Sequence, residues 1–260
     1  MNSKMRLDLL MFEKKLVSSR TKAQDLIQSG HIWYQDTESG PNSKWQQAKA
    51  ASEKVNTQAL IEIRDQQFDL YVSRGGLKLA GALERIKLNL SGKIALDVGL
   101  STGGFSDYLL QNGIEQIVGV DVGTGQLHAK LQNNTKLISI ESLNARDLRS
   151  DARLIAHMPP DGFDLVVVDV SFISLHLILP SIDQVLKNGG NVVALVKPQF
   201  EVGPKGLAKG GLVKDPELYT MVEDKVRKKC LELGWKVRDY FNSPIEGKDG
   251  NKEFFIWAEK

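Results

Sequence analysis

From residue 93 onward, short apolar runs alternate with amphipathic segments along the chain. The apolar runs predict seven strands, at 93–98, 116–121, 136–140, 163–169, 191–197, 236–242 and 253–258. The amphipathic segments predict helices near 75–87, 105–112, 125–132, 174–187 and 215–233. Apolar strands that alternate with helices are typical of a parallel sheet covered on both faces. The link 243–250 is too short for a helical crossover, so we expect the last two strands to be antiparallel.

The first part of the chain follows a different pattern. Apolar residues at helical spacing predict a helix within 6–17, and a second helix over 20–28 follows Ser18 and Ser19, either of which is an expected N-cap. Residues 31–34 and 60–63 are predicted strands on either side of a polar stretch, 35–54. The pattern therefore predicts a small α+β domain at 1–64, a linker at 65–72 and a larger α/β domain at 73–260.

The net charge of the whole chain says little about its function, and the charge of its two parts says slightly more. The 260 residues carry 34 basic and 32 acidic side chains, so the net charge of +2 does not by itself indicate a nucleic-acid-binding protein. Residues 1–64 hold ten basic and seven acidic residues, which leaves the surplus in the small domain.

The cysteine count and the hydropathy argue against a disulfide-bonded, exported or membrane-spanning protein. The single cysteine, Cys230, forms no internal disulfide, supports no metal cluster and is typical of a reducing cytosol, so no metal is predicted. No run of about 18 uncharged apolar residues and no export signal is present. We therefore expect a cytoplasmic protein that does not associate with membranes.

A glycine-rich turn between the first strand and the next helix is the first candidate for chemistry. Glycines tolerate positive φ and allow a ligand close to the backbone, but their spacing here differs from the G-x-G-x-x-G of nicotinamide-binding folds. The negative charge of Asp97, beside the turn, would repel a pyrophosphate but is compatible with a cationic ligand such as S-adenosylmethionine. Asp121 ends the second strand, where a carboxylate can accept hydrogen bonds from ribose hydroxyls. The candidate cofactor residues are Asp97, Gly99, Ser101, Thr102, Gly103, Gly104, Phe105 and Asp121. The alternative is a tight turn in which both acids act as caps.

Five strings of the larger domain resemble one family. They are Ser73-Arg74-Gly75-Gly76-Leu77-Lys78-Leu79, the Asp97–Phe105 turn, Val168-Asp169-Val170-Ser171-Phe172-Ile173, Lys197-Pro198-Gln199-Phe200-Glu201 and Asp249-Gly250-Asn251-Lys252-Glu253-Phe254. The chain resembles the haemolysin A group, which joins an S4-type RNA-binding module to an FtsJ-like ribose methyltransferase domain. The resemblance implies a Rossmann-like, seven-stranded, S-adenosylmethionine-dependent methyltransferase domain behind a small α+β S4-type domain.

The same resemblance implies an activity and a catalytic set. The activity is methyl transfer to a ribose 2'-hydroxyl of ribosomal RNA, with cytidine as the acceptor and the RNA or a ribosomal subunit as the partner. The tetrad maps onto Lys78, Asp169, Lys197 and Glu253. A 2'-hydroxyl is a poor nucleophile that must lose its proton as it attacks, and Lys197 is the candidate that contacts it. Taken singly, each of the four is also compatible with a helix cap or a solvated charge.

Two further features concern the adenine site and the small domain. Asn144 follows the third strand, where this fold contacts the adenine, although the residue two places earlier is Ser142 rather than the basic residue frequent in the family. The small domain resembles the S4 family through Arg6-Leu7-Asp8 and the helix after Ser19. The resemblance implies a basic edge that binds RNA phosphates, and the alternative is an ordinary solvated helix face. The residues of this expected edge are Arg6, Lys14, Lys15, Arg20 and Lys22. The domain differs from the family in the polar stretch 35–54, where the family has a tight hairpin.

Two other function classes are compatible with the sequence. One is an RNA-binding protein that keeps the fold without turnover, against which the intact tetrad argues. The other is a membrane-active lysin, suggested by the family's name and disfavoured by the lack of a spanning segment. The sequence carries no signal for a particular oligomeric state.

Overall fold

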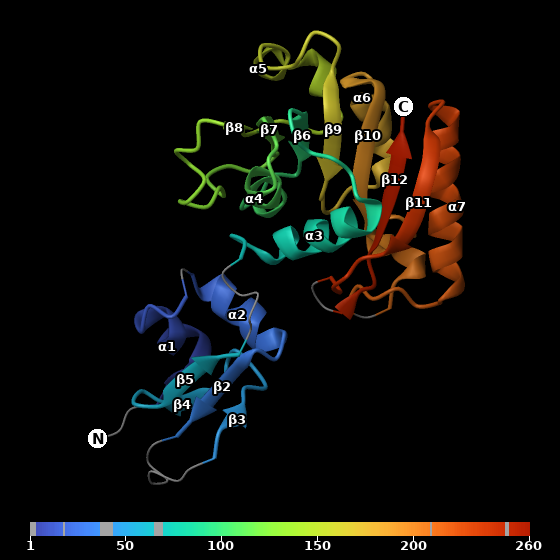
Figure 1. Ribbon diagram of the computed structural model, residues 1–260. Coiled ribbons are helices and arrows are strands. Elements are labelled where there is room, and N and C mark those ends of the chain that lie inside the picture. The colour runs from blue at the N-terminus through green and yellow to red at the C-terminus, as the bar shows by residue number, and fades with distance from the viewer. Residues whose placement is uncertain (1–3, 18, 37–43, 65–69, 209, 248–249) are drawn as a thin grey trace. The chain divides into compact units, whose positions relative to one another are not determined.

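The computed structural model describes residues 4–17, 19–36, 44–64, 70–208, 210–247 and 250–260. The chain divides into two compact units, Met1–Leu70 and Tyr71–Lys260 (Figure 1). Residues 65–69 of the expected linker lie outside the described residues. None of the described helices is long and apolar enough to cross a membrane.

The N-terminal unit packs two helices against short strands. Its elements are β1 (Lys4–Arg6), α1 (Leu7–Glu13), α2 (Arg20–Gln28), β2 (Ile32–Gln35), β3 (Gln46–Gln47), β4 (Lys54–Asn56) and β5 (Leu60–Ile63). The antiparallel order is β3-β2-β5, and β1 pairs with β4. Strands β1, β3 and β4 were not predicted because two or three residues are too few to show an alternating pattern. The Ser19 side chain accepts the Lys22 amide at 3.1 Å and is thus the N-cap of α2, whereas Ser18 lies outside the described residues.

A buried acid joins the two helices of this unit. The side chain of Asp8, in α1, is fully buried and accepts hydrogen bonds from Arg6 at 3.0 Å, Arg20 at 3.1 Å and Gln24 at 2.9 Å. The hydrogen bond from Arg6 is the main reason that the pKa of Asp8 lies well below its usual range. A buried carboxylate is stable only when its oxygens are paired in this way.

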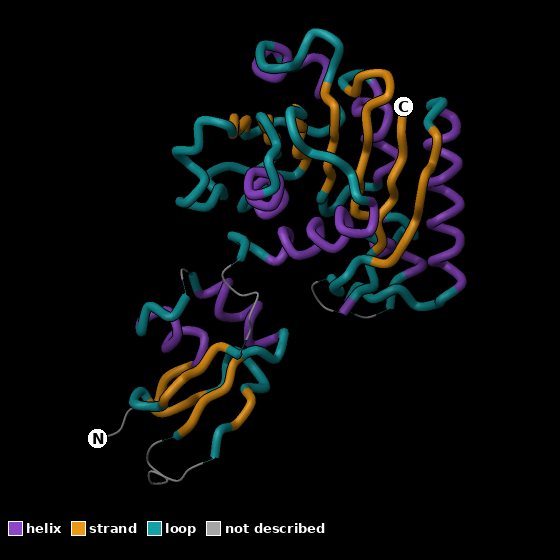
Figure 2. The backbone as a smooth tube through the Cα atoms, in the orientation of Figure 1, coloured by secondary structure: helices purple, strands orange, loops and turns teal. Residues whose placement is uncertain are grey.

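The larger unit is one seven-stranded sheet with helices on both faces (Figure 2). Its helices are α3 (Arg74–Ile86), α4 (Gly104–Gln111), α5 (Ala152–Ile155), α6 (Leu175–Asp183) and α7 (Glu217–Glu232). Its strands are β6 (Ile94–Val98), β7 (Gln116–Val120), β8 (Leu137–Ile140), β9 (Phe163–Val168), β10 (Leu186–Val196), β11 (Lys236–Asn242) and β12 (Phe254–Glu259). The order is β11-β12-β10-β9-β6-β7-β8, and β12 runs antiparallel to both of its neighbours. The predicted fold class is confirmed.

Alternate residues of each strand face two separate cores. Leu96 and Val98 of β6 pack with Leu175 of α6 and Val222 of α7 on one face. Ala95 of β6 packs on the other face, with residues of α3 and α4. Both faces are buried, which explains why the strands appear in the sequence as nearly continuous apolar runs.

The predicted helix at 125–132 is wrong. Gly125 has φ +66°, in the left-handed region, and the following residues form bends and turns. The His128 amide donates to the carbonyl of Thr102 at 3.2 Å, which ties this segment to the glycine-rich turn. A hydrogen bond between distant segments therefore shapes residues 125–132, in place of the helix that their apolar spacing predicted.

The predicted helix at 174–187 is too long, because α6 ends at Asp183 and β10 begins at Leu186.

Replacing Asp8 by asparagine should destabilise the N-terminal unit by about 1–3 kcal/mol, the usual cost of weakening buried hydrogen bonds to charged groups. Because the pKa of Asp8 is lowered by folding, its contribution is present above about pH 4 and is lost as the pH falls further. Hydrogen exchange of the α1 and α2 amides should therefore be faster in Asp8→Asn at neutral pH. The ratio of variant to parent rates should shrink toward pH 3, and a constant ratio would contradict the assignment.

Candidate active site

The strand order of the larger unit reverses at β6. The chain runs outward from β6 through β7 to β8, and then returns to the other side of β6 as β9. In open α/β sheets, ligands bind at the carboxyl ends of the strands at such a point. Gly99 follows β6 with φ +90°, and a Cβ at this position would lie 2.4 Å from the carbonyl oxygen of Asp169. The turn after β6 therefore needs a glycine so that it can lie against the segment after β9.

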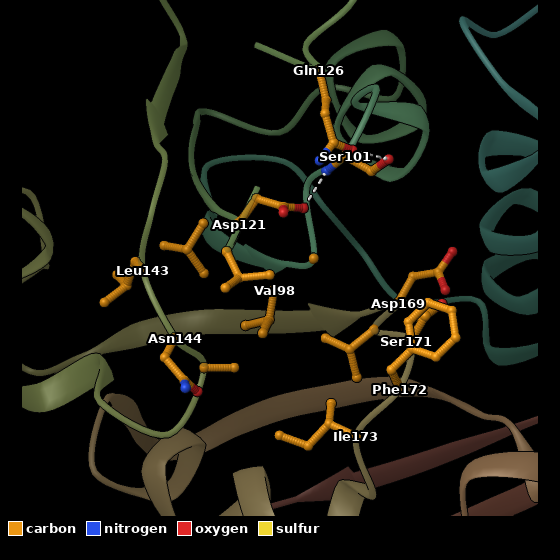
Figure 3. A pocket seen from close by; sticks show the side chains of 15 residues that line it. Val98, Ser101, Asp121, Gln126, Leu143, Asn144, Asp169, Ser171, Phe172 and Ile173 are labelled. Carbon is orange, nitrogen blue, oxygen red and sulfur yellow. Dashed lines mark hydrogen bonds between the residues drawn. The ribbon is translucent and has the colours of Figure 1, made fainter. Parts of the chain in front are cut away.

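A cavity of about 510 Å³ opens at this edge of the sheet, within the usual size range of small-molecule sites. Figure 3 shows its lining residues, which come from the ends of β6, β7, β8 and β9. Apolar walls are contributed by Val98, Val120, Leu143 and Ile173, and polar groups by Ser101, Asp121, Asn144 and Asp169. The lining therefore combines an apolar surface, which suits a flat ring, with a few polar groups at defined positions.

Asp121 is held in place by backbone amides. One carboxylate oxygen accepts the Ser101 amide at 2.8 Å, drawn as a dashed line in Figure 3, and the other accepts the Gly123 amide at 2.7 Å. A carboxylate has about four lone-pair sites, so two amides leave acceptor capacity for a ligand's hydroxyls. Asn144, also in the lining, accepts the Arg146 amide at 3.0 Å through Oδ1.

The other residues predicted from the glycine-rich turn have different positions. Gly99 and Ser101 line the 510 Å³ cavity, while Thr102, Gly104 and Phe105 line a second, smaller cavity beside it. Asp97 and Gly103 line neither of these two cavities. Asp97 is buried behind the turn, where its Oδ2 accepts the hydroxyl of Ser106 at 2.6 Å. Burial raises the pKa of Asp97 to about 7.

The four residues of the predicted tetrad form two ion pairs. Nζ of Lys78, on α3, lies 2.5 Å from Glu253, and Nζ of Lys197 lies 2.6 Å from Oδ1 of Asp169. The exposed fraction of these four side chains is between 3% and 22%. Val196 pairs with Phe254 in the β10–β12 ladder. Lys197 and Glu253 are therefore neighbours across two adjacent strands, which places both ion pairs at the same edge of the sheet.

Lys197 and Asp169 line the smaller cavity, which measures about 180 Å³. It shares Gly99, Ser101, Asp169 and Ser171 with the larger cavity. The Lys197 amine approaches Asp169 at ion-pair distance without the angles of a hydrogen bond, and its hydrogen bond goes to Ser171 Oγ at 3.1 Å. A cationic amine is thus held where the two cavities adjoin.

Sequence reasoning did not single out Ser171 or Phe172 as site residues, although both lie in a string that it had selected. Ser171 bonds the Lys197 amine. The Phe172 side chain is 90% exposed, its φ is +64° and its ring centroid lies 5.1 Å from that of Phe200. An exposed aromatic ring in a strained backbone conformation at a cavity edge indicates a functional surface.

The predicted basic residues all lie in the N-terminal unit, and two of them converge. The Arg6 and Arg20 side chains both bond Asp8, so they lie next to each other on one exposed surface. Nζ of Lys14 donates to the Ala59 carbonyl at 3.0 Å. Lys15 is exposed and Lys22 is partly exposed. The structure therefore groups Arg6 with Arg20 and holds Lys14 on the β5 side of the unit.

Comparison with known families decides the classification. The model of the FtsJ-like methyltransferases matches residues 71–260. This chain belongs to the FtsJ-like methyltransferase family. The S4 domain model also matches, over residues 5–36, so this FtsJ-like protein carries an S4 domain and the expected resemblance is confirmed.

Related proteins match almost the whole chain of this FtsJ-like methyltransferase. The 16S/23S rRNA (cytidine-2'-O)-methyltransferase TlyA of Mycobacterium tuberculosis is 37% identical over 97% of the chain and 88% of its own length. Hemolysin A of Brachyspira hyodysenteriae is 36% identical over 96% of the chain and 98% of its own length. A solved structure from Streptococcus thermophilus, named as a candidate hemolysin, is 35% identical with a TM-score of 0.74, covering 100% of this chain and 90% of its own.

The raised pKa of Asp97 predicts a pH-dependent stability. Because the folded pKa of about 7 exceeds the ordinary value of 3.8, ionisation of Asp97 costs stability increasingly as the pH rises between these values. Asp97→Asn cannot ionise, so its melting temperature relative to the parent should be higher at pH 8 than at pH 5. Melting curves of both proteins at the two pH values measure this difference, and a difference that does not change with pH would refute the raised pKa.

Proposed function

We propose that this protein transfers a methyl group from S-adenosylmethionine to the 2'-hydroxyl of a cytidine ribose in ribosomal RNA. The observation that carries the proposal is the Lys197–Asp169 ion pair in the lining of a small cavity that adjoins a cofactor-sized one, with the Lys78–Glu253 ion pair at the same edge of the sheet. The name and activity of the Mycobacterium tuberculosis relative support the choice of RNA and of cytidine. A ribosomal RNA substrate also implies a cytoplasmic protein.

The residues of the larger cavity fit S-adenosylmethionine. The apolar walls suit an adenine ring, Asp121 has acceptor capacity for ribose hydroxyls, and Gly99 allows close approach to the backbone. Asn144 supplies an amide donor for a base edge. The carboxyl of Asp97 is buried behind the turn, and its Oδ1 accepts no hydrogen bond from the described residues. When bound, the cofactor supplies an electrophilic methyl group on a positively charged sulfur.

The residues of the smaller cavity suit the acceptor hydroxyl. Lys197 lies at the point where the two cavities adjoin, and we assign to it the contact with the 2'-oxygen and the removal of its proton. Asp169 and Ser171 hold the Lys197 amine from one side. Lys78, on α3, and Glu253, directly before β12, form the second pair, and we assign to the Lys78 charge the stabilisation of negative charge that develops on the oxygen.

We assign the binding of RNA phosphates to the N-terminal unit. Arg6 and Arg20 present two guanidinium groups on one surface, and guanidinium groups bind phosphate without selecting sequence. In this scheme residues 1–64 form the S4-like RNA-binding domain, 65–72 the linker and 73–260 the catalytic domain. Two intact ion pairs in an enclosed site favour catalytic turnover over RNA binding alone.

Replacing Asp121 by alanine should weaken S-adenosylmethionine binding by about 1–3 kcal/mol, because hydrogen bonds between a carboxylate and the cofactor's hydroxyls are lost. Isothermal titration of parent and variant measures the change in dissociation constant. Asp161→Ala, a substitution of an exposed acid outside the site, is the matched control. An unchanged dissociation constant in Asp121→Ala would remove this residue from the cofactor site.

Replacing Lys197 by alanine should reduce methyl transfer by about 10²–10⁴-fold, the usual contribution of a general base. Lys197→Arg should not restore the rate, because a guanidinium keeps its charge but does not give up its proton near neutral pH. Single-turnover rates with saturating cofactor and ribosomal RNA are the measurement, and the affinity for S-adenosylmethionine should change little.

The matched control for Lys197 is Lys187→Ala. Lys187 also forms an ion pair, with Asp164, but it stands at the opposite end of β10. Its replacement should leave the methyl-transfer rate near that of the parent. A Lys197→Arg variant within about tenfold of the parent would exclude proton removal by this residue and would leave it an electrostatic role.

A further inference from the structure

Two segments that carry site residues lie side by side and touch at three points. One is the segment 169–175, between β9 and α6, and the other is the turn 197–201, which follows β10. The first contact is made by Lys197, which forms an ion pair with Asp169 and a hydrogen bond with Ser171, and the second is the ring contact between Phe172 and Phe200. The third contact lies farthest from the cavities and is made by Glu201, which has no role in the function proposed above.

Glu201 is a buried acid with three partners on two helices. One of its carboxylate oxygens accepts the Ser174 hydroxyl at 2.5 Å and the Lys225 amine at 2.9 Å. The other accepts the backbone amide of Leu175, at the start of α6, at 2.7 Å. The Glu201 side chain is 1% exposed. A buried carboxylate with this many charge-assisted hydrogen bonds fixes the groups that donate to it.

The position of Glu201 is coupled to that of Lys197 through a short turn. The Phe200 amide donates to the Lys197 carbonyl at 2.9 Å, and the Glu201 amide donates to the Pro198 carbonyl at 2.9 Å. Residues Pro198–Phe200 form a single 3-10 turn, with φ of Pro198 restricted by its ring. The backbone of Lys197 and the backbone of Glu201 therefore belong to one hydrogen-bonded unit.

The segment 169–175, which contacts this turn, is held at both of its ends. At the beginning, the Asp169 amide donates to the Val98 carbonyl at 3.0 Å. At the end, Glu201 binds Ser174 and Leu175. Between them, Phe172 keeps a φ of +64°, which a bulky residue retains only where its surroundings enforce it. Loss of the Glu201 contacts would release one end of this strained segment, which carries Asp169 and Ser171.

We propose that Glu201, supported by Lys225, is a positioning residue that keeps Asp169 and Ser171 in register with the amine of Lys197. It contacts neither of the two cavities and acts through the segment that it anchors. The effect on methyl transfer rests on the proposed function, whereas the effect on the position of residues 169–175 does not.

The test is the isosteric substitution Glu201→Gln. It keeps the size of the side chain but removes the charge that binds Lys225 and Ser174. With cofactor and RNA saturating, the single-turnover rate should fall by about tenfold or more, while the dissociation constant of S-adenosylmethionine stays within about twofold. Glu223→Gln is the matched control, because it breaks the Glu223–Arg227 ion pair on α7 without touching either segment. Its rate should equal that of the parent.

Two further variants distinguish positioning from general stability. Glu201→Asp keeps the charge but is one methylene shorter, so it should not restore the rate; full activity in this variant would overturn the proposal. Lys225→Gln removes only the supporting charge at a site that is 36% exposed, and it should fold normally with a smaller loss of rate. If Glu201→Gln lowers the melting temperature but leaves the saturated rate unchanged, the residue is structural only and the proposal fails.

Hydrogen exchange separates this inference from the proposed function. The amides of residues 170–176 should exchange faster in Glu201→Gln than in the parent, and those in Glu223→Gln should be unchanged. Failure of the parent protein itself to methylate RNA would reject the proposed function, and the exchange measurement would still decide whether Glu201 anchors the segment. Parental exchange rates in Glu201→Gln would overturn the proposal whatever the activity.

Discussion

The close approach of the backbone at Gly99 to the backbone at Asp169 is the constraint on which the site depends. A side chain at residue 99 would overlap the Asp169 carbonyl, so the turn after β6 lies against the segment after β9 only with glycine there. Both cavities include Gly99 and Asp169 in their lining. The two cavities can therefore adjoin at this point with no side chain of residue 99 between them.

The charges around this point are arranged in balanced pairs. Each lysine of the tetrad faces one carboxylate, so two cations are held in a largely enclosed region without net charge. A buried lysine without such a partner would be costly. Asp97 is buried behind the turn, and burial raises its pKa. The charged groups of the tetrad avoid this cost of burial because each one has a partner of opposite charge.

The sequence predicted the strands of the sheet well because both faces of its central strands are buried, so that β6, β7 and β9 are mostly apolar. It also placed Asp121, Asp169 and Lys197 at the carboxyl ends of strands, and in the structure each of them directly follows a strand. It could not predict which lysine pairs with which carboxylate, since Lys78 and Glu253 are 175 positions apart and meet only through the tertiary fold. The wrong helix at 125–132 has the same origin, because the hydrogen bond from His128 to Thr102 joins segments that no local pattern relates. Glu201 looked like one more charge after a strand, and only its partners on α6 and α7 give it a role.

The position of β12 has a consequence for how the protein folds. This strand lies between β10 and β11 in the sheet, although β11 precedes it in the chain. While β12 is absent from the sheet, β11 has no strand to pair with and the edge of β10 is open. Open apolar edges of this kind are sites of misassociation, and pairings between distant segments form slowly. Glu253 directly precedes this strand, so the Lys78–Glu253 ion pair forms only after β12 has joined the sheet.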